Sequence, residues 1–167
     1  MLQSFKKKTL CNFRKVLDMV SSDTRRINER IHQYWEDKKD GRAMPLEADI
    51  DPDEISDIWD SCFLVHVESG KDDQEFKYTY LGQSLIEAYG DDLNNKEVCE
   101  KLVYPSSMSL VHKFKEVITE QKPVIEDSEF TNTKGMLIKF RSCMLPLGKD
   151  SDSDVQYVIG GMKWKAF

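Results

Sequence analysis

The sequence predicts an α+β fold, with a five-stranded antiparallel sheet, a helical crossover on one face and helices at the N-terminus. Alternating apolar and polar residues mark two strands between residues 61 and 80, and three more between residues 124 and 164. About forty residues of helical and irregular sequence separate the two groups of strands. Two amphipathic helical segments precede the first strand.

The bulk composition is that of one globular domain with an appendage. The chain has 167 residues, of which 40% are hydrophobic. No apolar run is long enough to span a bilayer, and no continuous apolar stretch follows the basic N-terminus as in a secretory signal. The expected location is therefore the cytoplasm. The four cysteines form no CxxC pair, and we expect them to be reduced and mostly buried.

The net charge of −6 is unevenly distributed along the chain. Residues 1–42 contain eleven Lys/Arg and six Asp/Glu, a balance of +5, which leaves −11 for the remaining residues. A nucleic-acid partner needs a broad basic surface, which only the N-terminal arm could supply. No nucleic-acid partner is therefore expected.

The two N-terminal helices are predicted over residues 10–20 and 24–38. These apolar faces must be buried against something, so residues 1–42 are predicted to form an arm through which two copies associate as a homodimer. Residues 43–167 are predicted to form the domain itself. Contact of the basic first helix with an acidic membrane surface is an alternative that its interspersed acids disfavour. The candidate self-association residues lie on the two apolar faces: Phe13, Leu17, Val20, Ile27, Ile31, Tyr34 and Trp35.

A run of acidic residues follows over residues 47–54 and superficially resembles a calcium-binding loop. Glu54 occupies the position where that loop needs glycine, which argues against calcium. The pattern favours a helix start instead, with Asp51 as N-cap, Pro52 in the first turn and Glu54 completing a capping box. No metal site is predicted.

The first two strands are predicted over residues 61–68 and from Phe76 onward. Phe76, Tyr78 and Tyr80 alternate with polar residues and should share one face. The pattern breaks at Gly82 into a short helix over residues 84–89, which Ser84 can cap and Gly90 can close. A strand that turns into a helix in this way can form one wall of a pocket.

The second half of the chain begins with the longest predicted helix, from Pro105 to about Gln121. His112 lies opposite the apolar face of this helix, which disfavours haem ligation. Three strands then follow in hairpin succession, over residues 124–130, 136–147 and 155–164. Gly160 and Gly161 in the last strand mark a place where backbone or ligand approaches closely.

Short motifs in this order resemble a family of small stand-alone PAS proteins, which is found chiefly in alphaproteobacteria and was long catalogued as a domain of unknown function. The resemblance covers about residues 30 to 163 and implies the PAS fold. One departure is the segment Tyr78-Thr79-Tyr80-Leu81-Gly82, where relatives often carry an arginine in a Tyr-Arg-Leu-x-Gly-type pattern. The matching segments are Tyr34-Trp35, Gly41-Arg42, Pro45, Asp49-Ile50-Asp51-Pro52, residues 63–68, Tyr80-Leu81-Gly82, Tyr89-Gly90 with Leu93, Pro123-Val124 and Leu145-Pro146-Leu147.

The resemblance implies a non-enzymatic regulatory or signalling module that senses a small molecule or docks onto partners. We expect it to self-associate through its N-terminal helices and to act through a separate signalling protein, because no output domain is attached. The sequence contains no nucleophile elbow, phosphate-binding loop, dinucleotide fingerprint or zinc-protease motif, so catalytic residues are not assigned. A small enzyme of unrecognised class stays an alternative.

Two non-enzymatic hypotheses remain open: sensing of a small apolar or aromatic molecule between sheet and helices, and a ligand-free interaction adaptor. The cofactor is unspecified, and flavin photochemistry is disfavoured because the residues around Cys99 lack the motif of light-sensing PAS domains. An apolar wall with few polar groups is typical of ligand pockets, although the same residues can simply fill the core. The candidate pocket residues are Tyr78, Tyr80, Ile86, Tyr89, Phe114, Phe140 and Met144.

Overall fold

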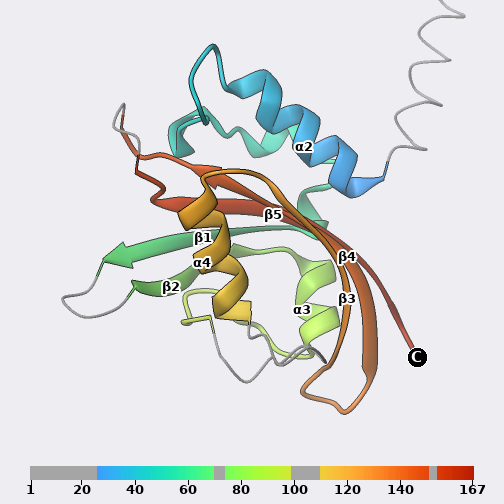
Figure 1. Ribbon diagram of the computed structural model, residues 1–167. Helices are drawn as coiled ribbons and strands as arrows, with labels where there is room; N and C mark the ends of the chain where they lie inside the picture. The colour runs from blue at the N-terminus through green and yellow to red at the C-terminus, as the bar shows by residue number, and fades with distance from the viewer. Residues whose placement is uncertain (1–25, 70–73, 99–109, 151–153) are drawn as a thin grey trace, which may run out of the picture.

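A computed structural model describes residues 26–69, 74–98, 110–150 and 154–167. Its centre is a five-stranded antiparallel sheet with the strand order β2-β1-β5-β4-β3 (Figure 1). The predicted two strands, crossover and three strands are confirmed. The last strand pairs with both β1 and β4 and so joins the two groups. The strands are β1 (Cys62–Ser69), β2 (Gln74–Leu81), β3 (Val124–Thr131), β4 (Leu137–Leu147) and β5 (Tyr157–Ala166).

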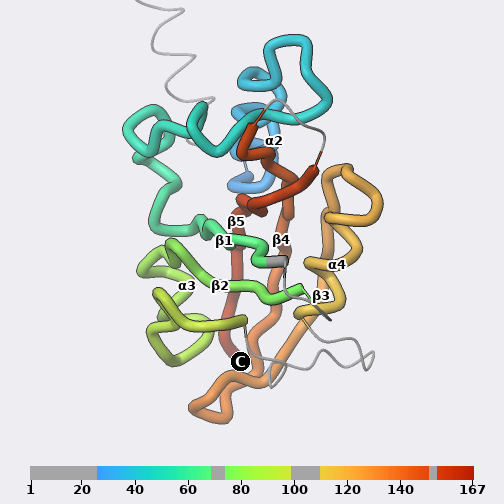
Figure 2. Tube along the Cα trace, turned by 90° about the vertical axis from the view of Figure 1, so that its left-hand side faces the viewer, coloured from blue at the N-terminus to red at the C-terminus, as the bar shows by residue number. Residues whose placement is uncertain are grey.

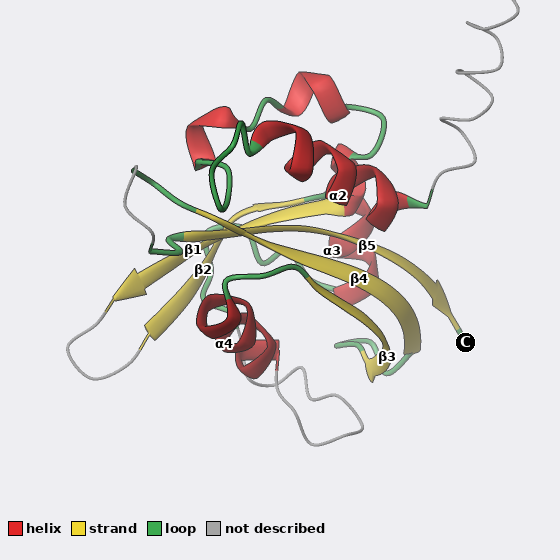
Figure 3. Ribbon diagram, turned by 45° about the horizontal axis from the view of Figure 1, so that its top comes forward, coloured by secondary structure: helices red, strands yellow, loops and turns green. Residues whose placement is uncertain are grey.

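Helices lie on both faces of this sheet. Helix α2 (Ile27–Lys38) crosses one face, which we call the outer face, and α3 (Gln83–Tyr89) and α4 (Leu110–Glu120) lie on the other, the inner face (Figures 1 and 3). In the turned view of Figure 2, α2 is at the top and α3 and α4 lie lower, to either side of β2. The predicted start of α4 near residue 105 falls outside the described residues.

Adjacent glycines of β5 separate the two faces. A side chain at Gly160 would lie 2.4 Å from the Phe63 ring, on the side of α4, whereas one at Gly161 would lie 2.9 Å from Ile27 of α2. Phe63 in turn meets Phe114 of α4 edge to face, with ring centroids 5.9 Å apart. The close approach predicted at this glycine pair is confirmed.

Helix α2 packs against its own sheet. Ile31 and Trp35 are 0% and 2% exposed, and Trp35 Nε1 donates to the Pro146 carbonyl oxygen of β4 at 2.7 Å. The apolar face of this helix, predicted as a self-association surface, is therefore covered by β4 and β5. The predicted division of the chain after residue 42 stays a prediction. Phe13, Leu17 and Val20 lie outside the described residues.

The acidic segment between α2 and β1 forms three short 3₁₀ helices. The Asp51 side chain accepts from Asp53 N at 3.0 Å, and Pro52 begins the helix, so the predicted N-cap is confirmed. The capping box is wrong, because the Glu54 carboxylate instead pairs with Lys38 of α2 at 2.6 Å. The 3₁₀ helices are η1 (Glu47–Asp49), η2 (Pro52–Ile55) and η3 (Trp59–Ser61).

The corner between β2 and α3 differs from its prediction at the cap. Gly82, and not Ser84, is the N-cap of α3. Residue 82 is a glycine because a side chain there would lie 2.2 Å from the Asp60 carbonyl oxygen. Ser84 instead receives a hydrogen bond from Trp164 Nε1 at 3.0 Å. Gly90 ends the helix with a φ of +81°, as predicted.

A second departure is Met136, with which this strand was predicted to begin; it is 39% exposed and precedes β4. The Asn132 side chain explains this, because its oxygen accepts from both Lys134 N and Met136 N and holds residue 136 in the hairpin loop.

The free edge of β2 is covered by the segment that follows α3. Tyr78 N donates to the Lys96 carbonyl, and Asn95 N donates to the Tyr78 carbonyl. The Asn94 side chain completes the pairing, since it accepts from Leu81 N at 2.7 Å and donates to the Leu81 carbonyl at 3.3 Å. At the opposite edge, β3 pairs with β4 alone among the described residues.

We predict that Gly160→Ala lowers the free energy of unfolding by about 3 kcal/mol, because its new methyl group meets backbone that cannot move aside. The Cys143 carbonyl oxygen lies only 2.2 Å from that position. Gly161→Ala is the matched control and should cost clearly less, because its methyl meets the movable side chain of Ile27. Urea unfolding measures both values, and equal costs would contradict this account of the strand.

Candidate functional site

Five of the seven predicted pocket residues lie together on the inner face and are buried. Tyr78 and Tyr89 have ring centroids 6.5 Å apart, and Phe130 bridges from Tyr89 (5.4 Å) to Phe140 (5.6 Å). Burial raises the pKa of the Tyr89 hydroxyl to about 12, so this group stays protonated as a hydrogen-bond donor. The five residues and their exposures are Tyr78 (1%), Tyr89 (6%), Phe114 (1%), Phe140 (6%) and Met144 (3%).

Tyr80 does not join this wall, which corrects its predicted position on the same face as Tyr78. A register shift between Leu64 and Val65 places Tyr78 opposite Val65, but Tyr80 opposite Leu64. The extra residue, Thr79, forms a β-bulge, so the alternation of faces is interrupted there.

Tyr80 consequently lies on the outer side of the sheet. Its ring stacks on Trp59 with centroids 4.3 Å apart, and its hydroxyl donates to the Trp59 carbonyl at 3.0 Å. The pKa of Tyr80 is raised to about 12, chiefly by burial. Ile86 of α3 is half-buried and packs at the border of the core, so it does not belong to the fully buried wall.

A serine interrupts the apolar wall of the inner face within β4. Ser142 lies between Phe140 and Met144 on the same face of β4 and is 2% exposed, and its hydroxyl has no hydrogen-bond partner in the described part of the chain. Its cross-strand neighbour is Glu126 of β3, of which one carboxylate oxygen is also buried without a partner. Sequence reasoning missed both residues, although a serine on the apolar face of this strand, between Phe140 and Met144, was the available signal.

The other carboxylate oxygen of Glu126 forms a salt bridge with α4. Lys113 Nζ lies 3.6 Å from Glu126 Oε1 and 3.7 Å from Glu116. Burial raises the pKa of Glu126 above its usual value, and the attraction of Lys113 offsets this only in part. The rim of the inner face toward α4 is therefore a hydrogen-bonding region beside the aromatic wall.

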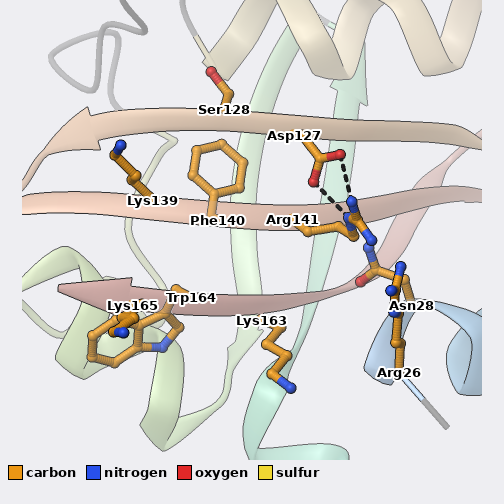
Figure 4. Close-up of a pocket in the computed structure, with 10 residues that line it drawn as sticks. All are labelled: Arg26, Asn28, Asp127, Ser128, Lys139, Phe140, Arg141, Lys163, Trp164 and Lys165. Carbon is orange, nitrogen blue, oxygen red and sulfur yellow. Dashed lines mark hydrogen bonds and ion pairs between the residues drawn. The ribbon is translucent and has the colours of Figure 1, made fainter.

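A separate groove of about 470 Å³ opens on the outer face, beyond the part that α2 covers (Figure 4). Arg141 pairs there with Asp127 through two hydrogen bonds, and this lowers the pKa of the Asp127 carboxyl. No sequence pattern marks the groove, because Arg26 joins the β4 and β5 cations only through the packing of α2 on the sheet. The lining residues are Arg26, Asn28, Asp127, Ser128, Lys139, Phe140, Arg141, Lys163, Trp164 and Lys165.

The residues that the structure describes give little support for a metal site or a reactive thiol. No three His, Cys, Asp or Glu side chains there come close enough to hold a metal ion. Cys62 and Cys143 are buried free thiols whose pKa burial raises to about 12, so they are poor nucleophiles. None of the described helices is long and apolar enough to cross a membrane.

Comparison with known proteins gives a family and several distant structures. The sequence matches the PAS domain family over residues 23–163. The light-state LOV domain of the blue-light photoreceptor Aureochrome1 superposes with a TM-score of 0.48 at 12% identity, over 66% of this chain and 84% of that one. No curated protein sequence gives a match.

Two further solved structures are similarly distant. The Erythrobacter litoralis blue-light activated histidine kinase EL346 has a TM-score of 0.47 and 17% identity, over 68% of this chain but only 36% of the kinase. The PAS domain of the fruit-fly ELK potassium channel has a TM-score of 0.46 and 14% identity, over 66% and 94% of the two chains. At these identities and scores, nothing about ligand or output transfers to this chain.

The raised pKa of Glu126 predicts a pH dependence of stability. The folded state holds this proton to higher pH than the unfolded chain, so the free energy of unfolding falls as the pH rises above the ordinary pKa of glutamate. Glu126→Gln cannot titrate, and we expect it to gain stability relative to wild type between about pH 4 and about pH 7.

The matched control is Glu129→Gln on the same strand, whose side chain is 40% exposed against 13% for Glu126, and which should follow the wild-type pH dependence. Urea midpoints across this pH range measure the effect. An identical pH dependence for wild type and Glu126→Gln would contradict the burial of a titrating carboxyl at this rim.

Proposed function

The chain belongs to the PAS domain family through residues 23–163, and from this premise we propose that it is a non-enzymatic regulatory module. In this proposal it senses a small molecule on the inner face of the sheet and passes the signal to a separate protein partner. The family resemblance in the sequence motifs is confirmed by this match.

The buried Ser142 hydroxyl is the observation that carries the sensing proposal. A hydroxyl that is 2% exposed and has no partner costs about 1–3 kcal/mol, and a wholly structural core would gain by having alanine there. A ligand with one hydrogen-bonding group would satisfy the hydroxyl while its apolar part met the aromatic wall. We therefore propose a small, mainly apolar or aromatic molecule with at least one polar group.

The runner-up is a ligand-free adaptor whose inner-face aromatics only fill the core. The close ring contacts around Tyr89 and Phe130 favour it, because they leave little space between those side chains. The adaptor proposal gives the Ser142 hydroxyl no role, and this is why sensing is preferred.

Native mass spectrometry and an absorption spectrum of freshly purified protein test the sensing proposal. We expect wild type to retain a bound mass, and Ser142→Ala to retain less of it by about fivefold, the loss of one hydrogen bond. Ser56→Ala, an exposed serine elsewhere, is the control and should bind like wild type. An empty wild-type protein that no member of a metabolite panel stabilises against heat would leave the adaptor as the better proposal.

Self-association is a further proposal, now confined to the part of the predicted arm that precedes α2. The apolar residues Phe13, Leu17 and Val20 remain candidates, whereas Ile31 and Trp35 are buried against their own sheet. We expect Phe13→Asp with Leu17→Asp to convert a dimer to a monomer in sedimentation equilibrium, because charge cannot be buried in an apolar contact.

The charge-matched control for this test is Gln3→Asp with Asn12→Asp, which adds the same two charges and leaves the apolar residues in place. The control should stay dimeric. A wild-type protein that is monomeric, or a double variant that keeps its full mass, would end the self-association proposal.

A further inference from the structure

We propose, building on the regulatory function above, that the outer-face groove binds an acidic segment of the partner protein in an extended conformation. The groove lies on the part of β3, β4 and β5 that α2 leaves uncovered (Figure 4). The occupant follows from the charge of the groove, the spacing of its cations and a buried amide on its wall.

The groove carries a positive net charge although the whole chain is acidic. Its lining contains five cations, two each from β4 and β5 and one before α2, and a single acid, which gives 5 − 1 = +4. The whole chain carries −6. A local field of opposite sign to the net charge attracts acidic partners. The cations are Arg26, Lys139, Arg141, Lys163 and Lys165, and the acid is Asp127.

Some of this charge is already neutralised and some is not. Arg141 is held by Asp127, and Lys139 lies 3.7 Å from Glu129. Lys163 makes no ion pair with any described residue, and the Lys165 ammonium lies over the ring of Phe167 without a carboxylate. The two β5 lysines are thus cations available to a partner.

The spacing of the cations fits an extended chain. Lys163 and Lys165 are two residues apart on the outer side of β5, and Lys139 and Arg141 repeat that spacing on β4. Alternate residues of a strand are about 7 Å apart, which is also the spacing of alternate side chains in an extended peptide. Acids at every second position of a bound segment would therefore meet successive cations.

Asn28 supplies an observation that is independent of charge. This residue of α2 is 6% exposed, and neither its amide nitrogen nor its amide oxygen has a hydrogen-bond partner. These absences hold among the described residues. Asn28 lines both the main groove and an adjoining hollow of about 210 Å³ that reaches the exposed apolar side chain of Ile125. A carboxamide offers one donor and one acceptor in the same arrangement as a peptide group.

The unpaired amide therefore matches a backbone ligand. Leaving both atoms of Asn28 buried without partners costs free energy in the unbound protein. Because both atoms are shielded from solvent, a partner reaches them by displacing a neighbouring side chain. The partner's peptide group would then recover that cost, and its carboxylates would meet the β5 lysines.

Other occupants fit less well. Residues 1–25 carry six Lys/Arg and two Asp, a balance of +4, and would be repelled by a groove of the same sign. A nucleic acid needs a continuous basic surface, but Glu29, Asp127 and Glu129 border this groove. A second copy could insert its exposed acidic segment around Asp53 and Asp60, and this becomes an outcome of the test.

Fluorescence anisotropy with the full chain tests the proposal. The probe is a fluorescein-labelled peptide of alternating glutamate and threonine, about twelve residues long, which favours an extended conformation. We expect it to bind, and its affinity to fall about tenfold when the salt concentration is raised from about 50 to about 200 mM. The double variant Lys163→Glu with Lys165→Glu should bind it at least about tenfold more weakly.

Two further variants test whether binding of the peptide depends on the groove itself, rather than on the total charge or the stability of the protein. Lys122→Glu with Lys149→Glu makes the same change of charge at exposed lysines outside the groove, and it should bind within about twofold of wild type. Asn28→Leu removes the unpaired amide at similar size. It should unfold at a urea midpoint equal to or above that of wild type, yet lose affinity for the peptide about fivefold.

Several results would overturn the proposal. The first two are a probe that does not bind at low salt, and groove and control variants that weaken its binding equally. The third is single-stranded polyuridylic acid that binds more tightly than the peptide. The fourth is a groove variant that changes the mass of the protein in sedimentation equilibrium. The last result would assign the groove to a second copy. The sensing proposal is tested separately through Ser142 and the retained mass, so a failure here leaves it standing.

Discussion

The two adjacent glycines at the centre of β5 are the constraint on which the rest of the structure depends. Gly160 leaves room for the ring of Phe63 and the carbonyl of Cys143, and Gly161 leaves room for Ile27 of α2. Because β5 pairs with both β1 and β4, a larger residue there would disturb two strand pairs and one helix contact together. The sheet can carry close-packed layers on both faces because side chains are absent at its middle.

The two faces differ in chemistry, and β4 connects them. Arg141 and Ser142 are consecutive residues of this strand, and one side chain points to the outer groove while the other points to the inner wall. A shift of β4 on binding an inner-face ligand would move both. In the proposed function, this is the shortest route by which an occupied inner face alters a partner on the outer face, and it needs no hinge or domain rotation.

Most of the fold could be predicted because local pattern and packing agree in this chain. The strand alternation, the Asp51 cap and the Gly90 stop are local features, and each was found. The Thr79 bulge was not, because nothing in the local sequence marks an extra residue that only the pairing partner reveals. It moved Tyr80 out of the expected wall, whereas five of the seven predicted inner-face residues do lie together.

The outer groove could not have been predicted for a related reason. Its β4 and β5 cations lie on a predicted hairpin, but Arg26, before α2, joins them only because α2 packs across β4 and β5. The burial of the apolar face of α2 against its own sheet could not be predicted either, since an amphipathic helix has the same sequence pattern whether its own sheet or a second chain covers it.

The pairing of residues 94–98 with β2 limits how chains of this protein can associate through their backbones. An open sheet has two edges, and repeated edge-to-edge pairing along both produces fibres. Here one edge already has its donors and acceptors occupied, so among the described strands only β3 can accept a strand from another chain. A contact between two β3 strands would use the free edge of each copy and leave none for a third. Growth through this sheet would therefore end at two chains.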